Sequence, residues 1–594
     1  MSTDLTFLHA PSVYDFRKKA IMFGPVSDLV PSTPVFEMYP IGFTTMAEFL
    51  ERNGYSTRIV NLAVRMLDEP DFDVEKFVQR LDSAMFGIDL HWLPHAHGSI
   101  EVAKLVKKLH PKTPVLFGGF SSSYFYDELI RYPSVDYVIR GDSTEIPLLQ
   151  LTQYVTGGGE THPSVGSTAA QQLEKIPNLV WKSADGQVHA NPMTYSPENL
   201  DELLIDYTHV IRSVVRHRDL ASVKPFRNWM KYPITAALSV RGCTHNCLTC
   251  GGSACAFRNI HNRQKPAYRN PEMLAQDIRT IGDYSEGPIF ILGDIRQPGK
   301  EYTQRFLNAI SGYKKPVFIE LFDAAPKQFF LDVAKALPNV VVEASMESHD
   351  EKVRRAFGRP YTNAAIEKSM DDALDAGCKR FDLYFMVGLK YQTYDSVMGT
   401  VAYSREMLRR YAGDGETRVI PFISPLAPFV DPGSRAFEEP EKHGYKLHAR
   451  TLEEHRQLLL KPSWKYVLNY ETEWMTRHEI ADSTYEAGRQ LNLMKGEFGV
   501  LKPDQVQCTD ERINYAIQLM KEIDDVVLKE KDAAVREKKL LALKTKVDGA
   551  NLSTVCDKRE LEIPVHGPRI NILQAAGIVL SDWVKDISKP SART

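Results

Sequence analysis

The chain has few cysteines, no long apolar run and almost no net charge, and each absence excludes a class of protein. Seven cysteines among 594 residues are too few, and odd in number, for a disulfide framework, which predicts a reducing, cytoplasmic setting. No stretch reaches the roughly 18 apolar residues of a membrane span. The first residues, MSTDLTFLHAPS, lack the basic and apolar regions of a secretory signal. The net charge of −3 argues against a general affinity for nucleic acid or anionic membranes.

The length points to several domains, because a single core rarely grows beyond about 250–300 residues. Residues 1–200 alternate short apolar strands with helix-length segments, which is typical of an α/β doubly wound, Rossmann-like parallel sheet. The expected strands are 5–10, 56–63, 83–90, 113–119 and 137–142, followed by a hairpin within 176–195 that turns at Asp185-Gly186. Residues 201–232 are polar and basic and are expected to form a linker.

Residues 233–450 contain six further apolar strands with helical segments between them. They lie at 234–240, 288–293, 316–321, 340–345, 381–388 and 418–424. Repeats of this length predict a barrel or partial barrel, in which ligands bind at the carboxyl ends of the strands. Residues 451–594 are expected to form a mostly helical domain, with one charged, solvated helix over 519–546.

Three cysteines lie within eight residues, at Cys243, Cys247 and Cys250 of RGCTHNCLTCGG, directly after the first strand of the expected barrel. A disulfide would leave one of the three over. A structural zinc site would require a fourth ligand, such as His245 or Cys255. A chance group of buried thiols is a further alternative. A four-iron cluster held by three thiolates would leave one iron open for a ligand, and the position at a strand end favours this interpretation.

This C-x3-C-x2-C stretch resembles the signature of radical S-adenosylmethionine (SAM) enzymes. The resemblance implies a partial (β/α)6 barrel and a [4Fe-4S] cluster held by Cys243, Cys247 and Cys250, which binds SAM at its fourth iron. The other cysteines, Cys255, Cys378, Cys508 and Cys556, are then not ligands. The stretches FILGDIRQPG, EASMES and YFMVGLKYQT resemble the family's SAM-contacting elements, and imply contacts from Gly293, Asp294, Ser345, Glu347, Gly388 and Leu389.

A doubly wound domain ahead of such a barrel resembles the cobalamin-dependent radical SAM enzymes, over about residues 1–450. The resemblance lies in YPIGFTTMAEFLERNGYSTRIVNLA, FGIDLHWLP, LFGGFSSSYF and VIRGDSTEIP. It implies cobalamin-binding residues His91, Trp92, Leu93, Gly118, Gly119, Ser121, Ser122, Gly141, Asp142 and Glu145. Many cobalamin-binding domains carry D-x-H-x-x-G after the first strand, and this chain does not. We therefore expect cobalamin without its own base on cobalt, shielded by Trp92 or Leu93, and with no histidine ligand.

The resemblance implies methylation of an unactivated carbon, using methylcobalamin and a 5′-deoxyadenosyl radical. One alternative keeps both cofactors for a cyclisation, rearrangement or oxidation without methyl transfer. A second alternative is a non-catalytic sensor that binds cobalamin or zinc. The expected partners are a small-molecule or lipid-like substrate and an electron donor such as flavodoxin or ferredoxin; no catalytic side chain is assigned.

Radical chemistry needs an enclosed cavity, so the C-terminal segment is of interest. If the segment 464–474 is helical, Tyr466, Tyr470 and Trp474 share one face, with Trp464 close by. We expect these rings either to attach the C-terminal domain to the barrel or to line the substrate cavity.

Overall fold

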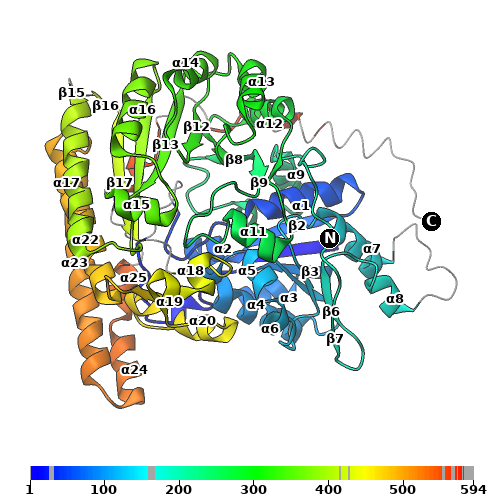
Figure 1. Ribbon diagram of the computed structural model, residues 1–594. Helices are drawn as coiled ribbons and strands as arrows, with labels where there is room; N and C mark the ends of the chain where they lie inside the picture. Colours follow the sequence, from blue (N-terminus) through cyan, green and yellow to red (C-terminus); the bar gives the residue numbers. More distant parts are fainter. Residues whose placement is uncertain are drawn as a thin grey trace.

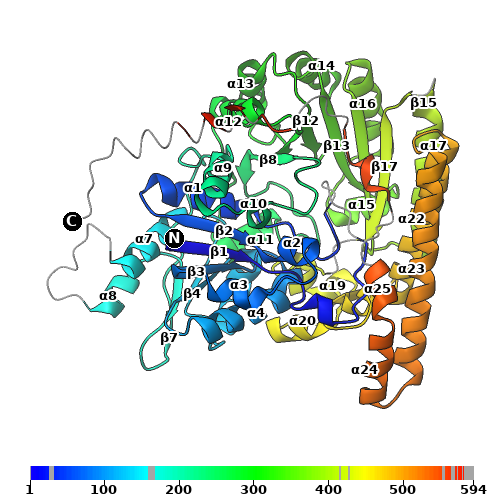
Figure 2. The ribbon, with the colours of Figure 1, turned by 180° about the vertical axis from the view of Figure 1, so that it is seen from behind.

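The computed structural model describes residues 2–25, 32–157, 168–413, 416–425, 429–550, 556–563 and 569–571, with scattered positions from 573 to 580. Two helix-flanked sheets dominate the molecule, the first blue to cyan and the second green in Figure 1. A set of long helices, drawn in orange, runs along the outer side of the second sheet (Figures 1 and 2). Within these described residues, no helix combines the length and the apolar composition needed to cross a bilayer.

The first sheet has seven strands in the order β2-β1-β3-β4-β5-β6-β7, in which β1 to β5 are parallel and the last two form an antiparallel hairpin. The parallel strands are almost wholly buried because helices cover both faces. The expected doubly wound fold is confirmed. The strands are β1 (Thr3–His9), β2 (Thr57–Asn61), β3 (Ser83–Asp89), β4 (Val115–Gly118), β5 (Tyr137–Ile139), β6 (Leu179–Lys182) and β7 (Val188–Ala190); the helices are α1 (Ile41–Arg52), α2 (Leu62–Asp68), α3 (Val74–Gln79), α4 (Ala96–Leu109), α5 (Phe120–Tyr124), α6 (Tyr126–Ile130), α7 (Glu145–Thr156) and α8 (Ala169–Leu173).

The second sheet has six parallel strands in sequential order, which is a partial barrel, as expected. Its strands are β8 (Thr235–Leu238), β11 (Ile289–Leu292), β12 (Val317–Leu321), β13 (Val340–Glu347), β14 (Arg380–Val387) and β17 (Val419–Pro425). The helices between them are α11 (Ala254–His261), α12 (Pro271–Tyr284), α13 (Lys300–Ile310), α14 (Lys327–Ala336), α15 (Glu351–Phe357), α16 (Asn363–Asp375) and α17 (Tyr394–Tyr411). The short strands β9 (Val240–Arg241) and β10 (Ala267–Tyr268) pair beside the cysteine loop. A short pair, β15 (Ala412–Gly413) and β16 (Glu416–Thr417), follows α17.

The segment expected to be a linker is partly helical. It contains α9 (Thr208–His217) and α10 (Leu220–Val223), and both pack against β2. Arg58 of β2 pairs with Asp219 at 2.8 Å, which fixes the segment on the first domain.

The C-terminal region departs from the sequence expectation in two places. The charged stretch 519–546 is not one helix: α23 (Pro503–Lys529) ends, and α24 (Ala533–Ala542) and α25 (Lys544–Ala550) fold back beside it. Asp532 caps α24 through its side chain, so a local cap ended the continuous helix that the charge pattern predicted. Residues 581–594 of the expected helical domain lie outside the described residues. The other elements are α18 (Arg435–Glu438), α19 (Pro440–His443), β18 (Tyr445–Leu447), α20 (Leu452–Leu458), α21 (Trp464–Val467), β19 (Tyr470–Thr472) and α22 (Arg477–Glu497).

The expected aromatic helix face is wrong, because α21 stops at Val467 and Tyr470 lies in strand β19. Tyr466 donates its hydroxyl to Asp524, and Trp474 packs on the ring of Tyr391. Trp464 donates to Tyr485. None of these four rings is among the residues that line the barrel cavity described below, and a role for them at the substrate stays a prediction.

Candidate functional site

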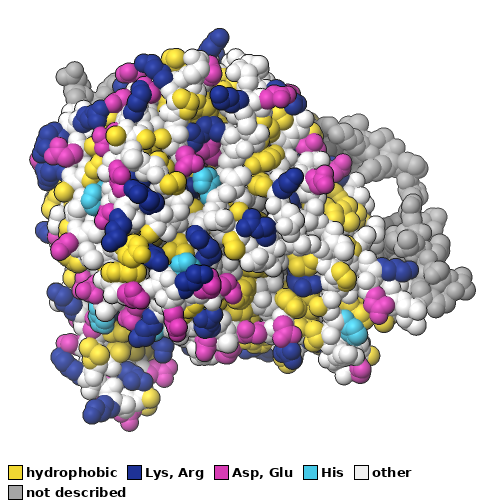
Figure 3. Space-filling model, viewed as in Figure 1, with side chains coloured by type: hydrophobic (Ala, Val, Ile, Leu, Met, Phe, Trp, Pro, Cys, Tyr) yellow, Lys and Arg dark blue, Asp and Glu magenta, His cyan; other side chains and the backbone are white. Residues whose placement is uncertain are grey.

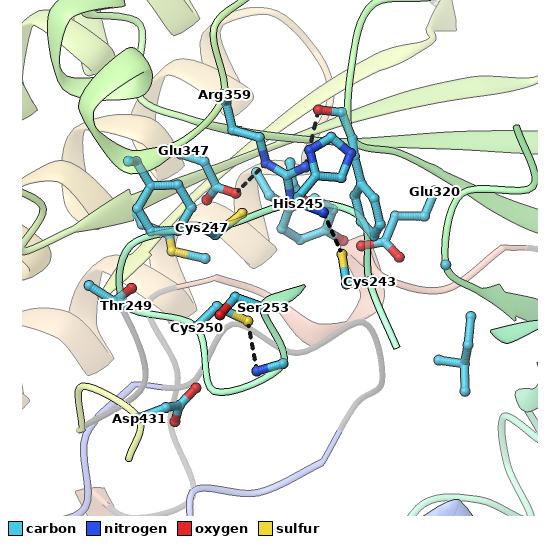
Figure 4. Close-up of a pocket in the computed structure, with 18 of the residues that line it drawn as sticks. Cys243, His245, Cys247, Thr249, Cys250, Ser253, Glu320, Glu347, Arg359 and Asp431 are labelled. Atoms are coloured by element: carbon cyan, nitrogen blue, oxygen red, sulfur yellow. Dashed lines mark hydrogen bonds and ion pairs between the residues drawn. The ribbon is translucent and has the colours of Figure 1, made fainter. Parts of the chain in front are cut away.

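Two cavities lie at the carboxyl ends of the two sheets. The barrel cavity, of about 570 Å³, is lined by the ends of the second sheet's strands and by the cysteine loop (Figure 4). The interdomain cavity, of about 430 Å³, is lined by the first sheet's carboxyl ends on one side and by β8 and β9 on the other. Leu238, Val240 and Gly242 line both cavities, so the two spaces share one wall.

Three thiols face the barrel cavity together. Cys243, Cys247 and Cys250 all line it, whereas Cys255 lies on α11 and does not. The Sγ of Cys243 accepts a hydrogen bond from the backbone N–H of His245 at 3.4 Å, and that of Cys250 accepts a backbone N–H at 3.2 Å. Such bonds to sulfur are usual around iron–sulfur clusters, so the donor set fits a [4Fe-4S] cluster.

Burial affects the protonation of two of these thiols. It raises the pKa of Cys247 to about 11 and the pKa of Cys250 well above the ordinary value, so both favour the thiol form until cationic iron binds. Across the described part of the chain, no three His, Cys, Asp or Glu side chains converge on the position of a single ion. The ligands of a four-iron cluster lie further apart than those of one ion.

Glu347 lies in the barrel cavity because the end of β13 is irregular. A register shift falls between Ser345 and Glu347, and Glu347 has a φ of 64°, a left-handed conformation that is costly for a non-glycine residue. Its Oε2 is buried, and no hydrogen-bond partner for it occurs among the described residues. A buried carboxylate oxygen without a partner fits a donor supplied by a bound ligand.

Arg359 is a site residue that sequence reasoning missed. Its guanidinium lies beside Glu347 and near Cys247 (Figure 4), with its Nε 3.6 Å from Oε1 of Glu347. Although burial disfavours the charge, Cys247 and Glu347 raise the pKa of Arg359. For Glu320, on β12 in the same cavity, burial is the main cause of the shift and raises the pKa to about 7. The position of Arg359 in the loop after α15 offered no motif, because only the fold brings that loop to the cluster.

The expected SAM contacts divide into two groups. Gly293, Ser345 and Glu347 line the barrel cavity. Asp294, Gly388 and Leu389 do not. Asp294 accepts hydrogen bonds from the guanidinium of Arg296 at 2.9 Å and from a backbone N–H at 3.1 Å. The backbone N–H groups of Gly388 and Leu389 both donate to the side chain of Gln392. Their contact with SAM stays a prediction.

The expected cobalamin contacts divide in the same way. The residues that line the interdomain cavity are His91, Gly118, Gly119, Gly141, Asp142 and Glu145. The residues that do not line it are Trp92, Leu93, Ser121 and Ser122. Ser122 donates to the carbonyl of Gly118 at 3.0 Å, and Leu93 is fully buried.

Two arginines neutralise acids on the wall of the interdomain cavity. Arg241 donates to Glu145 at 2.6 and 2.9 Å, and Arg263 donates to Asp142 at 3.1 Å. Both acids belong to the first domain and both arginines flank the cysteine loop. These acids therefore join the two domains, and their contact with cobalamin stays a prediction.

Trp92 also joins the two domains. Its indole N–H donates to Asp431 at 3.1 Å, and the other oxygen of Asp431 accepts the N–H of Gly251 at 3.0 Å. Asp431 lines the barrel cavity (Figure 4). Trp92 thus reaches the cysteine loop.

His9, Asp89 and His91 form one hydrogen-bonded group beside the interdomain cavity. Asp89 lies between the two rings, 2.9 Å from His9 and 2.7 Å from His91. Burial opposes the ionisation of Asp89, but the charge and hydrogen bonds of the two histidines hold its pKa well below the ordinary value.

Comparison with known families agrees with this arrangement. Residues 29–148 match the B12 binding domain, and residues 238–403 match the radical SAM superfamily. The chain belongs to the cobalamin-dependent radical SAM enzymes. The two matches assign cobalamin to the first domain of this enzyme, and SAM with its [4Fe-4S] cluster to the barrel.

Known relatives of this radical SAM enzyme extend the comparison. The chain is 26% identical over 297 residues to a hopanoid C-3 methylase of Methylococcus capsulatus, which covers 48% of this chain and 49% of the relative. The chain therefore spans about half the length of that curated relative.

Two solved structures share the fold. One is the cobalamin-dependent SAM radical enzyme OxsB with aqua-cobalamin and SAM bound, at 11% identity and a TM-score of 0.51, covering 98% of this chain and 80% of that one. The other is the radical SAM methyltransferase TsrM of Kitasatospora setae with cobalamin and a [4Fe-4S] cluster, at 13% identity and a TM-score of 0.50, covering 75% and 81%.

Proposed function

We propose that this enzyme methylates an unactivated carbon of a small-molecule or lipid-like substrate. The observation that carries the proposal is the wall that Leu238, Val240 and Gly242 give to both cavities. A substrate held in the barrel cavity at this wall is next to the cobalamin side of the molecule. The similarity to a hopanoid C-3 methylase supports methyl transfer to carbon.

When bound, the cluster and SAM supply a carbon radical, and cobalamin supplies the methyl group. In this proposal Cys243, Cys247 and Cys250 hold the cluster. Arg359 holds the carboxylate of SAM, because it is the buried cation beside the cysteines. Glu347 accepts polar hydrogens of the same molecule through its partnerless Oε2.

Close approach of a ligand requires glycine at position 293. Gly293 has a φ of 86°, and a Cβ there would lie 2.5 Å from Cγ1 of Val240. A side chain at this point would push into the shared wall. Gly293 therefore lets the backbone at the end of β11 border the SAM space.

The chain also keeps water out of the reaction space. Trp92, Asp431 and Gly251 close one seam between the domains, and the Arg241–Glu145 pair closes another. Exclusion of water protects radical intermediates from side reactions. These contacts are the chain's own contribution to the chemistry.

The electron donor is proposed to be an acidic protein such as flavodoxin or ferredoxin. An open cavity of about 510 Å³ is lined by Leu248, which lies between Cys247 and Cys250, and by several cations. These cations are Lys352, Arg355, Lys390 and Arg435. Figure 3 shows Lys and Arg side chains on this face, over α15 and α19, with Asp and Glu side chains among them. Positive charge beside the cluster loop favours an acidic partner. Cytoplasmic localisation, supported by seven free cysteines, belongs to the same proposal.

The test is anaerobic turnover of the reconstituted enzyme with SAM, reductant and an extract of the host cell. Methyl transfer produces S-adenosylhomocysteine together with 5′-deoxyadenosine, and a product heavier than its substrate by one methylene. Formation of 5′-deoxyadenosine alone would favour cyclisation, rearrangement or oxidation. Iron-loaded protein that never cleaves SAM would favour the non-catalytic alternative.

A further inference from the structure

The carboxylate of Asp89, at the end of β3, joins two imidazole rings. One oxygen lies 2.9 Å from Nδ1 of His9, and the other lies 2.7 Å from Nδ1 of His91. Nε2 of His9 lies 3.2 Å from the carbonyl oxygen of Phe36. The carbonyl of Phe36, the ring of His9, the carboxylate of Asp89 and the ring of His91 therefore form one chain of hydrogen bonds.

This chain fixes the tautomer of His91. An ionised carboxylate only accepts hydrogen bonds, so Nδ1 of His91 carries the proton and donates it to Asp89. Whenever the ring of His91 carries a single proton, that proton is on Nδ1 and Nε2 carries the lone pair. No hydrogen-bond partner for this nitrogen occurs among the described residues. A neutral imidazole oriented through its other nitrogen by a carboxylate is the form that binds metals.

Only one of the three neighbouring histidines can meet a ligand in the interdomain cavity. His91 lines that cavity with 28% of its side chain exposed. His9 and His95 are 0% and 1% exposed, and Nδ1 of His95 lies 3.1 Å from the carbonyl oxygen of Ala10. Of these three histidines, His91 is therefore the one that a ligand in the cavity can reach.

The backbone around His91 is also held in place. Gly119, at the end of the neighbouring strand β4, has a φ of 117°, and a Cβ there would lie 2.4 Å from Cα of His91. The glycine allows this close packing, so both the backbone and the ring of His91 are fixed. Trp92 is directed to Asp431, and Leu93 is fully buried away from the cavity.

We propose that Nε2 of His91 ligates the cobalt of bound cobalamin, with Asp89 and His9 as positioning residues. This inference rests on the proposed function, because a histidine can ligate cobalt here only if cobalamin binds in the interdomain cavity. It replaces the sequence expectation that Trp92 or Leu93 shields the metal without a histidine ligand. The ligand comes from the loop after the third strand, and not from the loop after the first strand where D-x-H-x-x-G motifs lie.

Electron paramagnetic resonance of the enzyme loaded with cob(II)alamin tests this assignment, with the cluster kept in its diamagnetic oxidised state. One histidine nitrogen on cobalt splits each cobalt line into a triplet. In protein labelled with [15N]histidine, the triplet becomes a doublet. This result needs no variant, and so it does not depend on how a substitution affects folding.

Two variants complete the test. His91→Ala should still bind cobalamin but lose the nitrogen splitting, whereas His95→Ala, its buried neighbour, should keep it. A splitting that stays a triplet after [15N]histidine labelling would come from the cofactor's own base and would overturn the proposal. Unsplit cobalt lines in the wild-type enzyme would overturn it too. Failure to bind cobalamin at all would overturn the proposed function as well, and is recognised by the absence of a cob(II)alamin signal.

Discussion

Arg241 and Glu145 form a buried, two-pronged ion pair that connects the cysteine loop to the first domain. The nitrogen–oxygen distances are 2.6 and 2.9 Å, and the two side chains are 11% and 1% exposed. Arg241 stands two residues before Cys243, and Glu145 begins α7 on the wall of the interdomain cavity. Replacing either side chain of this pair therefore removes a contact that holds the two domains together.

Breaking this pair should destabilise the protein strongly. Arg241→Met leaves the Glu145 carboxylate buried without its charge partner, and loss of one partner of a buried pair costs about 3–5 kcal/mol. Urea unfolding measures the loss. Arg305→Met, at the exposed pair with Glu272, is the matched control and should have no measurable effect. Equal effects of the two changes would contradict a joining role for Arg241.

Replacing a cysteine of the barrel cavity should affect the cluster, whereas replacing Cys255 nearby should not. Cys250→Ala removes a proposed cluster ligand, so iron and sulfide content should fall to background. Cys255→Ala should leave both unchanged, because Cys255 lies outside the cavity on α11, where its Sγ accepts from Asn259 at 3.5 Å. Iron and sulfide analysis of anaerobically reconstituted protein decides the point. Loss of the cluster in Cys255→Ala would indicate a closed, four-thiolate site.

Glu320 should make stability depend on pH. Burial raises its folded pKa from 4.5 to about 7, so between these values the folded state holds a proton that the unfolded state has released. Its contribution to stability is thus greatest below pH 4.5 and is lost as pH rises toward 7. Over that range the loss is at most about 3 kcal/mol.

Glu320→Gln removes the titrating group and should flatten this part of the pH profile. Relative to wild type, the variant should be more stable at pH 8 than at pH 5. Unfolding with the cofactors removed, followed across pH, measures the difference. The same substitution at exposed Glu75 should leave the profile unchanged, and an unchanged profile in Glu320→Gln would show that Glu320 does not titrate there.

Arg359 should contribute to SAM affinity. Replacing it with Met removes a charge-assisted hydrogen bond worth about 1.5–3 kcal/mol, which is a loss of roughly 10- to 150-fold in affinity. Anaerobic calorimetry with the cluster in place measures the Kd. Arg355→Met is the control, because its side chain is 64% exposed on α15. Wild-type affinity in Arg359→Met would remove this residue from the SAM site.

The cationic cavity should control reduction by an acidic protein donor. Reversing two charges, Lys352→Glu with Arg355→Glu, should lower the rate of flavodoxin-dependent reduction about tenfold at low salt, and the difference should vanish at high salt. Reduction by dithionite should be unaffected. Lys104→Glu with Lys108→Glu, on α4, is the matched control. Equal flavodoxin rates in the two double variants would place the docking surface elsewhere.

The sequence by itself determined the fold class and the loop that brings three cysteines to one cavity. Both signals are local: parallel strands buried on two faces are continuous apolar runs, and C-x3-C-x2-C lies within one loop directly after a strand. The six barrel strands and the five parallel strands of the first domain were therefore recognisable without the structure. The helix breaks within 519–546 and 464–474 were not, because caps and strand pairing replaced the periodic pattern.

The tertiary structure alone decided how the site is completed. Arg359, Asp431, Arg241 and the His9–Asp89–His91 chain join residues far apart in sequence, and no single segment shows such pairs. The sequence likewise showed no sign that the indole N–H of Trp92 donates to Asp431, and the contact of Trp92 with cobalamin stays a prediction. The physical reason is that a buried polar group must find a partner, and where that partner lies is fixed only when the domains pack.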